Sequence, residues 1–87
     1  MNDIVERMLV VYDGTSEEVL SLIRLPRFDL STFMERFDVD PDTDPDMHNR
    51  YAVGPDEIHF ILNHVDEDIE FDFQMRAYFV EAIINDL

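Results

Sequence analysis

The chain has 87 residues and carries six basic residues against 21 acidic ones, a formal net charge of −15 at pH 7. This length fits a single domain, residues 1–87, and the hydrophobic fraction of 46% is ordinary for a folded globular protein. The sequence contains no cysteine, which excludes disulfides and thiolate metal sites, and its charge disfavours direct binding to nucleic acid or anionic lipid.

The first quarter of the chain predicts two β-strands. Residues 4–12 are rich in β-branched and apolar side chains and end at a turn over residues 13–15. Residues 19–25 form a second apolar run that stops at Pro26. The short connection predicts an antiparallel hairpin. Because the first strand has apolar side chains on both faces, we expect helices or a partner to cover the hairpin.

A first helix is predicted after the hairpin. Asp29 or Ser31 supplies an N-cap, and apolar residues recur at helical spacing over residues 30–37. This helix is predicted to end before Pro41, because proline cannot continue a helix. Residues 50–53 are compatible with a short third strand.

Two more helices are predicted in the second half of the chain. Residues 54–57 open one of them, because Pro suits the first helical position and acids favour the positive end of a helix. The buried stripe of this helix is predicted to be Ile58, Ile61, Leu62 and Val65. The other is predicted over residues 72–85, where only Gln74, Glu81 and Asn85 leave a polar strip. The sequence therefore predicts an α+β domain, in which an antiparallel β-hairpin, with a third short strand as an option, packs with about three α-helices.

Carboxylates alternate with other residues between the first predicted helix and the third strand. Hard cations take several oxygen ligands, but the sharp-turn position of a calcium loop would hold Thr43 instead of Gly, and the twelfth position would hold Asn49. We therefore expect no metal or other cofactor here. The loop is predicted to be either a solvated segment or a recognition loop for a basic surface. Its aspartates are Asp38, Asp40, Asp42, Asp44 and Asp46.

A second acidic block lies between the last two predicted helices. It is explained either by the preference of a helix N-terminus for negative charge or by a second contact patch. Arg50 and Tyr51, beside the first block, have the composition of an interface hot spot. If the two blocks lay on one side, their combined charge would steer a basic partner to them. The second block consists of Asp66, Glu67, Asp68, Glu70 and Asp72.

Patterns that indicate catalysis are weak in this chain. His59 and His64 are five residues apart, so one face of a helix would not present both of them to a metal. No serine lies in a nucleophile elbow, and two glycines are too few for a phosphate-binding loop. We expect that the protein is not an enzyme.

Spaced hydrophobic and acidic residues recur through nearly the whole chain. They comprise YDGTSEE at 12–18, LIRLP at 22–26, Asp29-Leu30 with Phe33 and Phe37, YAV at 51–53, FDF at 71–73 and YFVE at 78–81. This pattern resembles small acidic bacterial immunity proteins of polymorphic or contact-dependent toxin systems. The resemblance implies a cytoplasmic protein that binds a toxin domain, commonly a basic nuclease, and masks its active site or substrate-binding face.

The functional prediction is a cytoplasmic immunity protein that neutralises a basic, nuclease-type toxin domain through its acidic patches. One alternative is a nucleic-acid mimic that inhibits a DNA- or RNA-binding enzyme. Another is a structural subunit of a salt-adapted cell, whose carboxylates would be spread evenly over the surface. A homodimer through the hairpin or the last predicted helix also stays open, whereas no apolar run is long enough to predict a membrane span.

Overall fold

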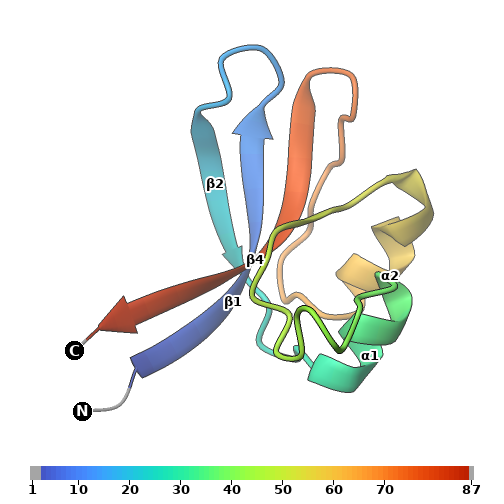
Figure 1. The fold of residues 1–87 in the computed structure, drawn as a ribbon. Coiled ribbons are helices and arrows are strands. Elements are labelled where there is room, and N and C mark those ends of the chain that lie inside the picture. Colours follow the sequence, from blue (N-terminus) through green and yellow to red (C-terminus); the bar gives the residue numbers. More distant parts are fainter. Residues whose placement is uncertain (1–2, 87) are drawn as a thin grey trace.

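The computed structural model describes the backbone of residues 3–86, which form a four-stranded antiparallel sheet with helices on one face (Figure 1). The strands lie in the order β2-β1-β4-β3, so the N-terminal and C-terminal strands are the two central ones. No helix within residues 3–86 is long and apolar enough to cross a membrane. The elements are β1 (Asp3–Asp13), β2 (Val19–Arg24), α1 (Leu30–Arg36), β3 (Tyr51–Ala52), the 3-10 turn η1 (Pro55–Glu57), α2 (Ile58–Leu62) and β4 (Arg76–Asp86).

The helix predicted over residues 72–85 is wrong, because this part of the chain contains the long strand β4. Every residue of β4 pairs with a residue of β1, from Asp13↔Arg76 to Asp3↔Asp86. A central strand uses both of its faces, so it reads as a nearly continuous apolar run in which the two-residue period is hidden. The β-branched and aromatic residues of the run favour the strand. The described chain therefore has two short α-helices, not about three.

The other predicted elements are confirmed with small changes in their bounds. β1 and β2 form the antiparallel hairpin, and Tyr51–Ala52 forms the short third strand, which pairs with β4. Asp29 is the N-cap of α1, since its side chain accepts a hydrogen bond from the Thr32 amide. The second helix is shorter than predicted, because α2 ends at Leu62 and His64 lies beyond it.

The main core lies between the sheet and the helices. Leu9 of β1 and Phe33 of α1 are both fully buried, and Phe33 packs against the rings of Phe28 and Phe60. Aromatic pairs of this kind add to the stabilisation that comes from burial alone. The buried residues of this core are Leu9, Val11, Ile23, Leu25, Phe33, Val39, Met47, Val53, Ile61, Val65, Tyr78 and Val80.

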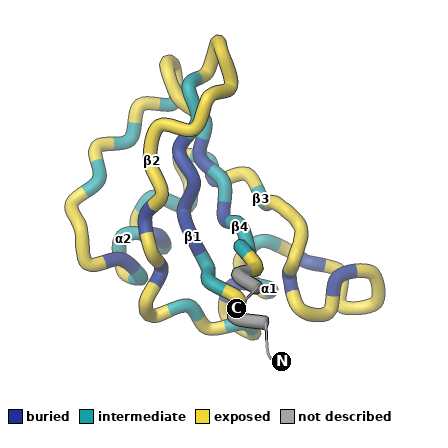
Figure 2. The backbone as a smooth tube through the Cα atoms, turned by 90° about the vertical axis from the view of Figure 1, so that its left-hand side faces the viewer, coloured by how far each residue is buried: buried dark blue, intermediate teal, exposed yellow. Residues whose placement is uncertain are grey.

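The other face of the sheet is also apolar near its centre. Val10 is only 2% exposed, and its neighbours across the sheet are Leu22 of β2 and Phe79 of β4. Exposure on this face increases toward the edge strand, where Leu22 is 54% exposed. Figure 2 shows the same gradient, from a dark blue centre in β1 to a mostly yellow β2.

Candidate partner-binding surfaces

The first candidate surface is the acidic loop, residues 38–47, and one of its aspartates points inward. Asp44 is 7% exposed, although four other aspartates of the loop lie at the surface. Its carboxylate accepts hydrogen bonds from the Tyr51 hydroxyl at 2.6 Å, the His48 amide at 2.8 Å and the Asn49 amide at 3.0 Å. A buried carboxylate with three donors is satisfied, and it holds the loop against β3.

The same contacts set the charge of Asp44. The hydrogen bond from the Tyr51 hydroxyl, helped by the amides of His48 and Asn49, lowers the pKa of Asp44 despite its burial. The contact also raises the pKa of Tyr51, because ionising the phenol would remove the donated proton. Asp44 is therefore an ionised anchor at neutral pH.

Two further contacts hold the acidic loop in place. Val39 and Met47, near its two ends, are buried in the main core. Arg7 of β1 donates hydrogen bonds to the carbonyl oxygens of Met47, at 2.7 Å, and Asp46, at 2.8 Å. Its guanidinium also lies over the Phe28 ring, 4.6 Å from the ring centroid. The loop is thus tied to the domain by polar and apolar contacts along its length.

The aspartates that the acidic loop leaves at the surface lie on both sides of the buried one. The Asp42 amide donates to the Asp40 side chain at 2.9 Å, which closes a local turn. No group of three or more His, Asp or Glu side chains that could hold a metal ion is found in the described part of the chain. The exposed carboxylates are those of Asp38, Asp40, Asp42 and Asp46.

The predicted hot-spot residue Arg50 is occupied by contacts within its own chain. Its guanidinium lies 4.3 Å from the centroid of the Phe79 ring and 4.9 Å from that of Tyr12. It also forms an ion pair with Glu81 at 3.2 Å, and the Tyr12 hydroxyl donates to the same carboxylate. The other predicted hot-spot residue, Tyr51, is half-buried and bonded to the anchor of the acidic loop. Both side chains therefore have a structural role.

The second candidate surface is the acidic segment, residues 66–72. Its carboxylates do not precede a helix, so their explanation as helix N-terminal charge is wrong. From Asp68 onward its residues alternate: Ile69 and Phe71 pack on the core, whereas the acids between them face outward. At the start of the segment, Asp66 pairs with Arg27 at 2.5 Å. All five predicted acids, Asp66, Glu67, Asp68, Glu70 and Asp72, are exposed.

Tyr78 of β4 holds the acidic segment against the sheet. It is 2% exposed, and its ring packs against Phe71 at 4.8 Å and Phe73 at 5.2 Å between centroids. Its hydroxyl group accepts a hydrogen bond from the Asp72 amide at 2.8 Å and donates one to the Glu70 carbonyl at 3.5 Å. Sequence reasoning missed this role because it placed Tyr78 on a helix.

The structure does not bring the two acidic blocks together. The acidic loop lies beside β3 and the acidic segment beside β2, and these strands are the opposite edges of the sheet. Figure 2 shows the two on opposite sides, the loop to the right of β4 and the segment to the left of β2. One continuous docking face that includes both blocks is therefore not formed, and each must be treated as a separate surface.

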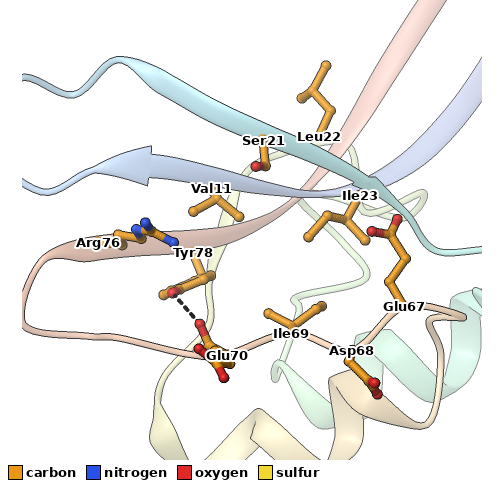
Figure 3. Close-up of a pocket in the computed structure, with 10 residues that line it drawn as sticks. All are labelled: Val11, Ser21, Leu22, Ile23, Glu67, Asp68, Ile69, Glu70, Arg76 and Tyr78. Atoms are coloured by element: carbon orange, nitrogen blue, oxygen red, sulfur yellow. Dashed lines mark hydrogen bonds between the residues drawn. The ribbon is translucent and has the colours of Figure 1, made fainter.

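An open groove of about 370 Å³ separates the acidic segment from β2 (Figure 3). Ser21 and Ile23 line it from the strand, and Arg76 and Tyr78 line it from β4. The opposite wall is formed by residues 67–70, and Figure 3 shows the Glu67 carboxylate reaching toward Ile23. No sequence signal indicated this groove, because it depends on how the segment crosses the sheet.

These features define a small acidic α+β domain with a four-stranded antiparallel sheet, one helix-covered face and two separate acidic surfaces. Residues 6–81 match the family described as a domain of unknown function, DUF7683, and the chain belongs to that family. No curated protein and no solved structure matches the chain.

Proposed function

We propose that this protein is an immunity protein that binds and neutralises a basic toxin domain, with the acidic loop as its docking surface. The observation that carries the proposal is the anchored loop, which presents four exposed carboxylates around a buried fifth one, Asp44. A surface that is ordered before binding loses less conformational entropy on association than a flexible one.

The charge of the domain supports a cationic partner. A net charge of −15 attracts basic proteins over distances of about a Debye length, roughly 10 Å at 0.1 M salt. Such steering raises association rates toward about 10⁸–10⁹ M⁻¹s⁻¹ at low ionic strength. A nuclease must present Lys and Arg side chains to phosphate, so an acidic protein on that surface displaces the substrate. Neutralisation of this kind requires no catalytic group in the chain.

Co-expression tests the function. The reading frame beside the gene for this chain supplies the toxin candidate, and we expect it to encode a secreted protein with a basic C-terminal domain. We expect cells that express this domain to survive when they also express the protein. If the toxin still kills at full expression of the protein, the proposed function is wrong.

A matched pair of variants tests the surface. The loop variant carries Asp38→Asn, Asp40→Asn, Asp42→Asn and Asp46→Asn, and the control neutralises four exposed acids elsewhere, with Glu17→Gln, Glu18→Gln, Glu35→Gln and Asp56→Asn. Both lose the same charge, so any difference reports the position of the carboxylates. We expect the loop variant to associate with the toxin domain at least tenfold more slowly at low salt than the control. Equal rates would show that the acidic loop is not the docking surface.

A further inference from the structure

β2 is an edge strand with a free row of backbone hydrogen-bonding groups. Within the described residues its only neighbouring strand is β1. The Leu25 amide donates to the Arg7 carbonyl at 3.0 Å, and the register continues as Leu9↔Ile23. Hydrogen-bonded pairs alternate along an antiparallel ladder, so the backbone groups of Ile23 point toward β1 and those of Leu22 point away from the sheet.

Three side chains of this edge are apolar and exposed. Val19 and Leu22 are each 54% exposed, and Leu20 is 46% exposed. Native proteins commonly protect an edge strand with charged side chains, proline or a bulge, because a free edge pairs with other chains. The bulge in β2 lies near its start, between Val11 and Tyr12 of the partner strand, and the charged Arg24 lies at its end, so residues 21–23 between them have neither a charge nor a proline.

The two faces of this edge differ in chemistry. Figure 3 shows Ile23 pointing toward the groove and the Glu67 carboxylate of the opposite wall, while Leu22 points the other way. Leu22 lies next to Val10 on the face that the helices do not cover. A strand added to β2 would therefore meet acidic side chains on one face and apolar side chains on the other.

We propose that an extended segment of a basic partner protein adds to β2 as a fifth strand. Its backbone pairs with the free groups of β2, its basic side chains point into the groove, and its apolar side chains lie beside Leu20 and Leu22. Strand addition gives affinity through main-chain hydrogen bonds and specificity through alternate side chains. This surface lies on the opposite edge of the sheet from the acidic loop, so the inference does not depend on the proposed function.

Charge decides between a basic partner and a second copy of this chain. Two copies paired through β2 would bring two chains of net charge −15 together, each with the acidic wall of Glu67, Asp68 and Glu70 beside the new pairing. Like charges that face each other across a new strand pair destabilise it. A segment that carries Arg or Lys at alternate positions turns the same wall into an attraction.

The binding test uses a fluorescent ten-residue peptide of alternating Arg and Val with blocked ends. We expect saturable binding in 10 mM NaCl, measured by fluorescence anisotropy. The same peptide with every backbone amide N-methylated keeps its charge but has no N–H group left to pair with a strand, and we expect its affinity to fall at least tenfold. No saturable binding of the parent peptide, or equal affinity of the methylated one, would overturn the proposal.

Variants of the protein locate the binding. Leu22→Pro removes an amide that points away from the sheet, a position at which an edge strand tolerates proline, and Leu22→Ala keeps that amide. We expect at least tenfold weaker peptide binding by the Pro variant than by the Ala variant. If Leu22→Pro does not fold, the methylated peptide still decides the question.

The acidic wall is tested by combining Glu67→Gln, Asp68→Asn and Glu70→Gln. A control of equal charge combines Glu35→Gln, Asp42→Asn and Asp56→Asn, all exposed and away from the groove lining. We expect weaker binding and a smaller salt dependence only for the wall variant. Sedimentation completes the test: a concentration-dependent dimer that Leu22→Pro abolishes would show that a second copy occupies the edge, against the proposal.

Discussion

The acidic loop and the acidic segment carry similar charge but are held by different forces. The loop has buried residues near its two ends, but between them it is held by hydrogen bonds centred on the Asp44 carboxylate and the Arg7 guanidinium. The segment is held mainly by apolar packing, since Ile69 and Phe71 alternate with its acids and pack on the core, where Phe71 lies against Tyr78. One acid in a run of acids can therefore hold the run against the domain, and the hydrogen-bond donors around it determine which acid is buried.

Removing the anchor of the acidic loop is expected to have the largest effect. Asp44→Ala leaves the Tyr51 hydroxyl and two backbone amides without their acceptor, so we expect a loss of about 3 kcal/mol in the free energy of unfolding. Asp42→Ala is the control, because its side chain is exposed and its removal should cost less than about 0.5 kcal/mol. Urea unfolding measures both. Equal midpoints would show that Asp44 does not anchor the loop.

The hydroxyl that supports the acidic segment is expected to matter less. Tyr78→Phe keeps the packed ring but removes the acceptor of the Asp72 amide, so we expect a loss of about 1–2 kcal/mol. Hydrogen exchange gives the local result: the Asp72 amide should exchange faster in the variant, while the His48 amide of the other region keeps its rate. Faster exchange of both amides by the same factor would mean that the two regions do not open separately.

The stabilisation of the fold by Asp44 should be lost at low pH. Because the pKa of Asp44 is lower in the folded chain than the unfolded value of about 3.9, its ionised form stabilises the fold above about pH 4. The stability difference between the wild type and Asp44→Ala should therefore shrink as pH falls through the lowered folded-state pKa. Urea unfolding from pH 7 to pH 2 measures this difference, and a constant value would contradict the assignment.

Neutralising exposed acids should have the smallest effect on stability, and in the opposite direction. Three neutralised carboxylates in either region reduce self-repulsion, so Asp38→Asn with Asp40→Asn and Asp42→Asn should stabilise the fold by about 0.5 kcal/mol or less in 10 mM NaCl. The variant Glu67→Gln with Asp68→Asn and Glu70→Gln should behave alike. Both gains should disappear in 0.5 M NaCl, where screening is strong. A loss above about 1 kcal/mol would identify a structural acid in that region.

Several local features of the fold follow from the sequence alone. The hairpin, the N-cap at Asp29 and the short strand at residues 51–52 were predicted from turn residues, capping chemistry and short apolar runs. Each of these signals acts between residues that are close in the chain, so a linear reading of the sequence contains it.

The tertiary structure decided the rest. Residues 76–86 form a strand because every one of them pairs with a residue of β1. Even the pair that is nearest in sequence, Asp13 and Arg76, is more than 60 positions apart. Asp44 is buried because Tyr51 and two amides supply donors, and the acidic blocks separate because the sheet order puts β2 and β3 at opposite edges. Composition fixed a strongly negative chain, but only long-range pairing and desolvation determined which carboxylates stabilise the fold and which lie at the surface.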